Sequence, residues 1–433
     1  AIANYNDKVD SDNNGSIKTY HECSTGSGPH LVVFNGAAAG GTITLPINLH
    51  NRPFSGLPFI TDNVTISGPV VIDGGGAAVN SHIFYTNGGA VLTLTNLVLQ
   101  NGYTSGGGGA IVGYGGDDVI NIVASSIQNN RAEGNGGAIN VAGQLNILAS
   151  NFSGNKALGL DLNGTDYPGM GGAIYQTGYN SLKISLSNFA GNIASDGGGA
   201  IATSADSGQI SDSVFNGNIV DDDAPTETTQ GGGAIHNSGN NSNKGINVVR
   251  TAFNGNLSFD APGGAIFNAP DGYLQVSDSS FNGNIAGDLT TETLGGAIYN
   301  QEVLIVRRVM FLGNVAANGA PDGNGGAIWN GNTQQGGPAS NLYLYNSTFS
   351  LNASPNAGAA IFNQSDGQHT ISLANTIIDG LGIAGDSCNE GLTSLGHNID
   401  SAESCGLNEP TDQSNTDPKL ETLAFNGGPL VSL

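Results

Sequence analysis

One short pattern recurs nine times along the chain, and this repetition limits the possible fold more than any other feature. Each copy contains an Ala-Ile step, which follows glycine directly in all copies but the last, and consecutive copies are 27 to 35 residues apart. The alanines of these steps are Ala110, Ala138, Ala173, Ala200, Ala234, Ala265, Ala297, Ala327 and Ala360. A repeat of this length predicts a solenoid, because each unit can bury its apolar face only against the units beside it.

Two further positions recur in a fixed register with this step. In seven consecutive copies a phenylalanine follows it, and an asparagine lies three residues after the phenylalanine. The phenylalanines are Phe152, Phe189, Phe215, Phe253, Phe281, Phe311 and Phe349, and the asparagines are Asn155, Asn192, Asn218, Asn256, Asn284, Asn314 and Asn352. Stacking of equivalent residues in neighbouring coils predicts an internal aromatic stack and a ladder of hydrogen-bonded amides.

The residues before each phenylalanine alternate between apolar and polar, which is typical of a strand with one buried face. In the copy that contains Phe311, the apolar positions are Leu304 and Val306. No stretch shows a sustained helical period, and 69 of the 433 residues are glycine, so helical repeats are excluded. About 30 residues with three short strands is the size of one coil of a parallel β-helix.

These observations predict an all-β chain that forms a single-stranded, right-handed parallel β-helix with three short strands in each coil. Residues 31–378 have room for roughly 11 coils, which gives a rod on the order of 50 Å long. The right-handed sense follows the general rule for parallel crossover connections. Residues 1–30 are predicted to cap the N-terminal end of the rod, and residues 379–433 the C-terminal end.

The third residue before phenylalanine is charged in four consecutive copies, which hold Asp212, Arg250, Asp278 and Arg308. Charges are too costly to bury in a dry column, so the chain is expected to turn here and carry this position to the outside. Opposite charges one coil apart then form a ladder of attractive pairs. Each pair contributes about 0.5 kcal/mol and favours the native pairing of coils over one shifted by a single coil.

The composition excludes several classes of partner. The chain has 35 acidic and 11 basic residues and a formal net charge of −24, so we expect no nucleic-acid partner. No apolar run reaches the length of a membrane-spanning helix, and we expect no direct insertion into a membrane. The first ten residues do not resemble a signal peptide. We interpret the chain as a processed protein that is secreted or displayed on the cell surface.

Three cysteines are present, Cys23, Cys388 and Cys405, and none has the spacing of a metal site. Cys388 and Cys405 are 17 positions apart in a segment rich in Gly, Ser and Asn. We predict a disulfide between these two residues, which indicates an oxidising compartment.

The alternation of GGAI and FxxN over residues 100–365 resembles the repeats of the polymorphic outer-membrane proteins and other bacterial β-helix adhesins. The run TSLGHNIDSAESCGLNEPTDQSNTDPKLETLAFNGGP resembles the choice-of-anchor Q domain at the end of many secreted bacterial β-helix proteins. AIAN, at residues 1–4, resembles the tail of the CSLREA segment with which such proteins often begin. This resemblance implies a partner for Cys23 upstream of residue 1, so Cys23 is expected to be a free thiol in this chain.

An acidic loop is the best candidate for chemistry. The sequence IVDDDAPTETTQ places Asp221, Asp222 and Asp223 close to Glu227. Carboxylate oxygens are the ligands that Ca²⁺ prefers, so this loop is the predicted cation site, although no cofactor is required. Solvation of an acidic surface explains the same residues, and converging carboxylates would also serve a glycosidase.

The nucleophile and phosphate-binding motifs of known enzyme classes are absent from the sequence. Parallel β-helices are also the fold of pectate lyases and polygalacturonases, so a polysaccharide hydrolase or lyase that uses the loop at Asp221 is the alternative. The basic residues that a lyase needs, such as Lys183 and Arg308, lie on the strand before phenylalanine and not beside that loop. We therefore predict a non-catalytic structural or adhesive surface protein. Its expected partners are extracellular glycans or proteins, or further copies of the chain stacked end to end.

Overall fold

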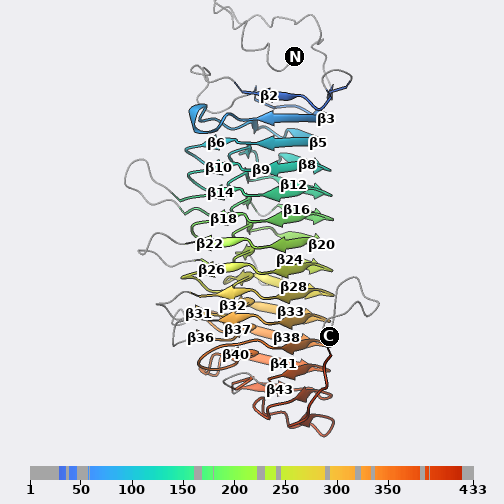
Figure 1. The fold of residues 1–433 in the computed structure, drawn as a ribbon, viewed down its shortest axis with the longest axis vertical. Coiled ribbons are helices and arrows are strands. Elements are labelled where there is room, and N and C mark those ends of the chain that lie inside the picture. The colour runs from blue at the N-terminus through green and yellow to red at the C-terminus, as the bar shows by residue number, and fades with distance from the viewer. Residues whose placement is uncertain are drawn as a thin grey trace, which may run out of the picture.

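The computed structural model describes residues 29–35, 39–45, 57, 59–159, 168–178, 180–221, 230–239, 245–287, 293–316, 323–332, 337–380, 386–389 and 391–421. These residues form a parallel β-helix, a rod in which each coil of the chain adds one layer to three long sheets (Figure 1). The single helical element within the described ranges is a short 3-10 turn, η3 (Gly76–Ala78). The predicted fold class is confirmed.

The largest sheet, called the long sheet below, contains 25 strands within the described residues. Its strands are β1 (His30–Val33), β2 (Thr42–Thr44), β3 (Val64–Asp73), β5 (Val91–Gln100), β8 (Val119–Val123), β9 (Ser126–Gln128), β12 (Gln144–Leu148), β13 (Asn151–Ser153), β16 (Ser181–Ser185), β17 (Asn188–Ala190), β20 (Ser207–Ser211), β21 (Val214–Asn216), β24 (Gly245–Val249), β25 (Ala252–Asn254), β28 (Tyr273–Ser277), β29 (Ser280–Asn282), β33 (Val303–Arg307), β34 (Met310–Leu312), β38 (Asn341–Tyr345), β39 (Thr348–Ser350), β41 (Thr370–Ala374), β42 (Ile377–Asp379), β43 (Leu392–Ser394), β44 (Ile399–Asp400) and β45 (Gln413–Ser414).

Two smaller sheets form the other faces of the rod, again counted over the described residues. The ten-stranded sheet consists of β4 (Phe84–Thr86), β7 (Ile111–Gly113), β11 (Ile139–Val141), β15 (Ile174–Gln176), β19 (Ile201–Thr203), β23 (Ile235–Asn237), β27 (Ile266–Asn268), β32 (Ile298–Asn300), β37 (Ile328–Asn330) and β40 (Ile361–Asn363). The eight-stranded sheet consists of β6 (Tyr103–Thr104), β10 (Arg131–Ala132), β14 (Lys156–Ala157), β18 (Ile193–Ala194), β22 (Ile219–Asp221), β26 (Leu257–Phe259), β30 (Ile285–Ala286) and β35 (Val315–Ala316). A separate pair joins β31 (Thr293–Leu294) to β36 (Gly323–Asn324).

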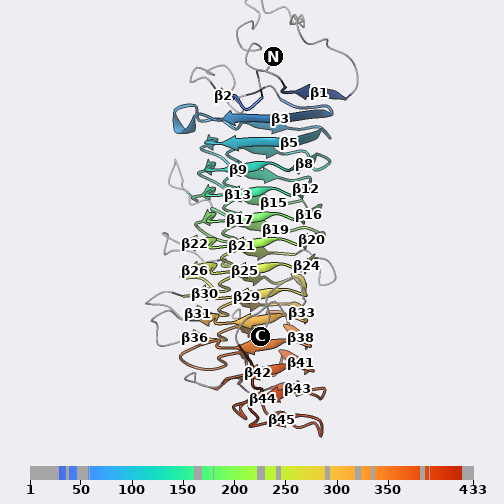
Figure 2. The ribbon, with the colours of Figure 1, turned by 45° about the vertical axis from the view of Figure 1, so that its right-hand side comes forward.

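Most coils place two short strands in the long sheet, because the chain bends between them (Figure 2). In the coil built from β11, β12, β13 and β14, the bend lies at Ala149, which has a left-handed backbone with φ of 49°. The coil therefore carries four short strands on three faces, and not the three strands predicted from the sequence, because the bend divides the strand of the long sheet into two. In the first coils the same face is spanned by single ten-residue strands, β3 and β5.

Equivalent residues of successive copies lie opposite each other in neighbouring coils. Phe152 of β13 pairs with Phe189 of β17, and Ile139 of β11 pairs with Ile174 of β15. Along the long sheet, the described strands from β1 to β42 make twelve layers, close to the number of coils expected from the repeat length. Strands of neighbouring coils therefore pair so that equivalent positions of the sequence repeat lie opposite each other.

The double glycine of the repeat lies at a corner where two coils approach closely. Gly295 has a φ of 69°, which glycine adopts without the steric penalty of other residues. A Cβ atom on the next residue, Gly296, would lie 2.1 Å from the carbonyl oxygen of Gly326 in the following coil. The first glycine is thus required by backbone conformation and the second by the distance between coils.

A single hydrophobic core runs along the rod axis, from Leu45 near one end to Cys405 near the other. It is lined by inward residues of the long sheet, such as Leu304 and Val306 of β33, and of the ten-stranded sheet, such as Ile298 of β32. After β45 the chain turns back along the side of the rod (Figures 1 and 2).

Candidate functional site

The seven repeat phenylalanines form one continuous stack inside the rod. All seven side chains are fully buried, and adjacent ring centroids are 4.6 to 5.0 Å apart with the ring planes within 10° of parallel. Because their faces and edges are enclosed, these rings cannot contact a ligand. Their role is to fill the core and hold coils in register.

The repeat asparagines form a hydrogen-bonded ladder beside this stack. From Asn155 to Asn314, each side-chain Nδ2 donates to Oδ1 of the asparagine in the next coil, at 2.8 to 2.9 Å. The same Nδ2 donates to a backbone carbonyl of the preceding coil, as Asn218 does to Phe189 at 3.0 Å. Each amide is thereby tied to the coils on both sides. The sequence count began this ladder at Asn155, but Asn130 extends it by one coil.

A second polar column, made of serine and threonine, was not predicted from the sequence. The residue two positions before each phenylalanine is serine or threonine in most coils, and its hydroxyl accepts the backbone N–H of the equivalent residue one coil earlier. Ser125 N donates to Ser150 Oγ at 3.2 Å, and Ser150 N donates to Ser187 Oγ at 3.1 Å. These hydroxyls satisfy backbone donors that are left without a strand partner at the bend.

An outward-facing aromatic stack also escaped the sequence analysis. It occupies the ten-stranded sheet, one residue after each Ala-Ile step, and consists of His236, Phe267, Tyr299, Trp329 and Phe362. The inward residues next to it form another asparagine ladder, Asn237, Asn268, Asn300, Asn330 and Asn363, with bonds of 2.7 to 2.9 Å. The first four members of the aromatic stack are buried although they point away from the core. Burial lowers the pKa of His236 to about 4.

The charged residues before phenylalanine lie on the outside, at the bend of the long sheet. All four have positive φ values, between 47° and 54°. Arg250 donates two hydrogen bonds to Asp212, at 2.6 and 2.8 Å, and Arg308 binds Asp278 in the same way. These bonds hold the pKa of each aspartate below its usual value. The four charges thus form two bidentate pairs across neighbouring coils.

Arg307, next to this column, takes a different partner. Its guanidinium lies 5.5 Å from the ring centroid of Tyr345 in the following coil. The contact joins β33 to β38 through a cation–π interaction on the surface.

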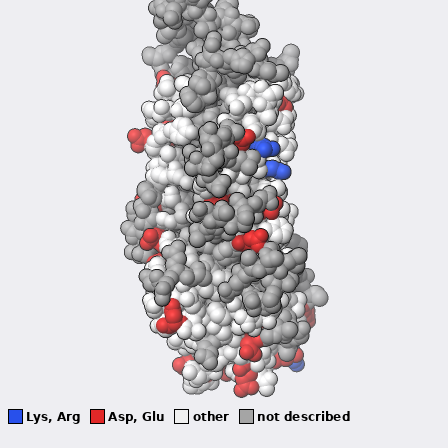
Figure 3. All heavy atoms as spheres, turned by 90° about the vertical axis from the view of Figure 1, so that its left-hand side faces the viewer, with Lys and Arg blue, Asp and Glu red and all other residues white. Residues whose placement is uncertain are grey.

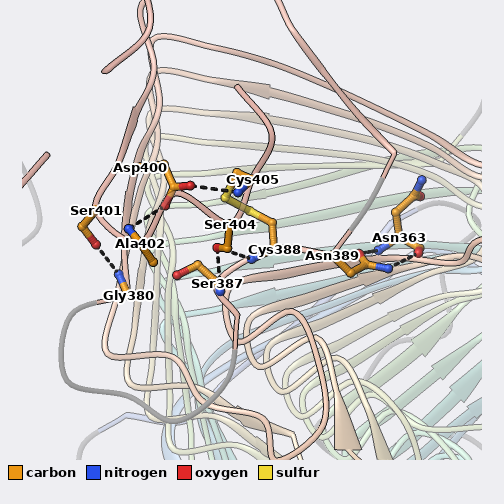
Figure 4. Close-up of a disulfide and its surroundings, with 10 residues drawn as sticks. All are labelled: Asn363, Gly380, Ser387, Cys388, Asn389, Asp400, Ser401, Ala402, Ser404 and Cys405. Carbon is orange, nitrogen blue, oxygen red and sulfur yellow. Dashed lines mark hydrogen bonds between the residues drawn. A yellow bond between two sulfur atoms is a disulfide. The ribbon is translucent and has the colours of Figure 1, made fainter. Parts of the chain in front are cut away.

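The predicted disulfide joins Cys388 to Cys405 near the C-terminal end of the rod (Figure 4). Both cysteines are buried, and Cys388 forms an isolated parallel bridge with Ile361 of β40. Asp400 accepts the backbone N–H of Cys405 at 2.8 Å. The disulfide therefore fastens the chain beneath the last strand of the ten-stranded sheet. Cys23 lies outside the described residues.

The acidic loop is described only at its first residue. Asp221 ends β22 and is exposed, whereas Asp222, Asp223 and Glu227 lie outside the described residues. In the described part of the chain, no three His, Cys, Asp or Glu side chains are grouped so that they could hold a metal ion. The predicted Ca²⁺ site is therefore still a prediction.

A Ser-His-Asp arrangement is present but lacks the access that a catalytic triad needs. Nδ1 of His369 accepts the backbone N–H of Ser340 at 2.9 Å and lies 2.7 Å from its Oγ. Nε2 of the same ring lies 3.2 Å from Asp366 Oδ2. Ser340 is 0% exposed, so its hydroxyl cannot reach a substrate carbonyl. The three residues secure a turn between coils.

Comparison with known protein families gives a match to a short part of the chain. Residues 278–301 match the repeat of the Chlamydia polymorphic membrane protein family. The matched stretch begins at the bend residue Asp278 and contains Phe281, Asn284 and the glycine corner, all parts of the coil lattice. No curated protein and no solved structure matches the chain. Within the described residues, no helix has the length and apolar character needed to cross a membrane.

Proposed function

We propose that this protein is a non-catalytic rod of the bacterial cell surface, which acts as a structural or adhesive element. The observation that carries the proposal is the burial of the repeated motif. Phe and Asn of each copy are enclosed and bonded to neighbouring coils, as Phe281 and Asn284 are. A repeated motif whose side chains are buried indicates a structural role in the stacking of coils. Repeated active sites would instead need side chains that reach solvent.

The short family match supports placement on a bacterial surface. The matched repeat is named for membrane proteins of Chlamydia, and the stretch that it covers carries both motif elements of one coil. The disulfide between Cys388 and Cys405 adds support, because such bonds persist in oxidising compartments outside the cytosol.

End-to-end contact between rods is a further part of the proposal. A parallel β-helix presents unpaired strand edges at its ends unless they are covered, and such edges pair with other chains. At the N-terminal end, β1 carries Leu31 at 68% exposed and Val33 at 51% exposed. Electron microscopy of concentrated protein tests this part: filaments support it, and dispersed single rods contradict it.

The decisive experiment separates binding from turnover. The protein is incubated with polygalacturonate and other polyuronides, and reducing ends and unsaturated sugars are measured over time. The expected result is no product, together with retention of the protein on a glycan array. Release of either product would overturn the non-catalytic assignment. A variant that lacks residues 221–223 locates the activity in that case, because a scaffold tolerates this deletion and a hydrolase does not.

A further inference from the structure

The outer face of the eight-stranded sheet changes character along the rod. Tyr103 of β6, Arg131 of β10 and Lys156 of β14 occupy one outward position in three consecutive coils. In the five following coils the same position is aliphatic and half-buried, with Ile193, Ile219, Leu257, Ile285 and Val315. On the face drawn in Figure 3, basic side chains gather in a small patch in the upper half and appear again at the lower right edge, while acidic side chains are scattered along the whole length.

Arg131 and Lys156 are exposed and lie directly opposite each other on paired strands. Like charges in this relation repel, and neighbouring strands are only ~4.8 Å apart. Within the described part of the chain, neither residue forms an ion pair, although the protein has 35 acidic residues. Arg250 and Arg308 differ in this respect, because each of them forms an ion pair with an aspartate. Apart from the contact of Arg131 with the ring of Tyr103, no contact within the described residues offsets the repulsion between these two cations.

Arg131 is also held in a defined orientation. Its guanidinium carbon lies 5.5 Å from the ring centroid of Tyr103 in the preceding coil. The Tyr103 hydroxyl donates to the buried side chain of Glu133, and this bond raises the pKa of the tyrosine. The bond to Glu133 thus fixes the Tyr103 ring, and the guanidinium of Arg131 lies against this ring. Within the described residues, the five N–H donors of Arg131 have no protein acceptor.

A notch of about 460 Å³ opens beside this guanidinium. Three consecutive coils line it, with Asp73 in the first, Tyr103 in the second and Arg131 in the third. Asp73 accepts hydrogen bonds from Gly75 N, Gln100 Nε2 and Asn101 Nδ2, which leaves about one of its four acceptor positions for a ligand. The notch extends over about 10 Å along the rod, the length of a disaccharide.

We propose that this notch binds a saccharide that carries one carboxylate. Arg131 holds the carboxylate, Asp73 accepts a sugar hydroxyl, and Lys156, opposite Arg131 in the next coil, adds positive charge beside the notch without lining it. Arginine matches the planar geometry of a carboxylate through two parallel hydrogen bonds. A single acidic sugar suits the site better than a polyanion, because the net charge of −24 repels a long chain of negative charges. The inference rests on the adhesive function proposed above and names the class of ligand.

The test compares cellobiouronate with cellobiose, which differ only in a carboxylate at the position of one hydroxymethyl group. Both are titrated into the whole protein by calorimetry at low and at high salt. Cellobiouronate is expected to bind at least about tenfold more tightly than cellobiose, because a bidentate charge-assisted bond is lost in the neutral sugar. This preference is expected to shrink as salt is added.

Three variants locate the site. Arg131→Gln is expected to abolish the preference for cellobiouronate, Arg131→Lys to retain part of it, and Lys156→Gln to weaken it. Lys183→Gln is the matched control, because Lys183 is an exposed cation on β16 of the long sheet, which neither lines the notch nor pairs with the strand of Arg131. Circular dichroism checks that each variant is folded.

Equal affinity for the two sugars, absence of binding, or a preference that survives in folded Arg131→Gln would overturn the proposal. Adhesion of the wild-type protein to cells is measured separately. If adhesion persists while the notch shows no carboxylate preference, the adhesive function stands and only this ligand assignment fails.

Discussion

The interior and the exterior of the rod share one backbone lattice but use it differently. Inside, the same residue type recurs from coil to coil, as in the phenylalanine stack and the asparagine ladder. Outside, at the bend of the long sheet, the equivalent position holds Ala124, Leu186, Asp212 and Arg250 in different coils, all with φ between 46° and 52°. Identical backbone conformation is thus compatible with apolar, acidic and basic side chains.

This difference shows that inward side chains hold the coils in register, whereas outward side chains give each part of the surface its own character. A side chain inside the rod contacts the equivalent residue above and below, so a change in any copy leaves its neighbours without a partner. A side chain at the bend meets solvent on at least one side, and its replacement costs little. The interior therefore sets register, and the exterior is where contacts with other molecules can vary along the rod.

The largest contrast is expected between an inward and an outward apolar residue. Phe253→Ala removes the central ring of the stack and leaves a cavity, which is expected to lower the free energy of unfolding by about 4 kcal/mol. Leu186→Ala, at an exposed bend position, is expected to change it by less than about 0.5 kcal/mol. Guanidinium unfolding measures both values. Similar losses in the two variants would contradict the separation of interior from exterior.

His236 tests the boundary between the two regions, because it points outward but is buried. Its pKa is about 4 in the folded protein, against ~6.5 in an unfolded chain. The unfolded state therefore binds the proton more readily, and stability falls as the pH is lowered from 6.5 towards 4, by about 3 kcal/mol in total. His236→Phe, which continues the stack from Phe267, is expected to lack this component of the pH dependence. An unchanged pH profile in the variant would contradict the assigned burial.

The paired charges at the bend are expected to contribute little to the free energy of unfolding. Asp278→Asn is expected to lower the free energy of unfolding by about 0.5 kcal/mol, because the pair with Arg308 is largely exposed. Arg308 lowers the pKa of Asp278, so this contribution is present above pH ~4 and is lost as the pH falls through the folded pKa. Thermal unfolding at low and high salt measures it. An effect that persists at high salt would show that the pair is not a screened surface contact.

The smallest expected effect is a gain in stability. Two residues after each phenylalanine, the middle and later coils have glycine with positive φ, but Leu351 occupies this place with φ of 55°. Leu351→Gly relieves the left-handed strain and adds flexibility to the unfolded chain, with a net gain of about 0.5 kcal/mol. Gly313→Leu, one coil earlier, is the matched reverse change and is expected to destabilise the rod. Loss of stability in Leu351→Gly would contradict this account of the corner.

The fold class could be predicted from the sequence because interior positions repeat by residue type. Counting back from each phenylalanine is enough to align the coils, and Asp278 and Arg308 fall opposite each other by the same count. The same count would also have predicted the serine column, since Ser150 and Ser187 both lie two residues before a phenylalanine. It was missed because serine is common in this chain and gives no apolar signal.

Other features could not be read from the pattern. The outward aromatic stack varies in residue type from His236 to Trp329, and strand alternation alone assigns these positions to solvent. Their burial comes with stacking on one another and packing against Leu294 of β31, which the alternation within one strand does not contain. The notch at Arg131 likewise depends on three coils whose lining residues differ, so no repeat marks it.

Removal of one whole coil tests the central claim that each copy of the repeat is one structurally equivalent coil of the rod. Deletion of residues 138–172 joins Gly137 to Ala173, which is equivalent to Ala138 in the next coil. Deletion of residues 138–154 is the control, because it joins positions that are not equivalent. The account predicts that the first variant is a folded rod shorter by ~4.8 Å in small-angle scattering, with an unchanged strand signal in circular dichroism, and that the second does not fold. Failure of the whole-coil deletion to fold, or equal behaviour of the two variants, would contradict it.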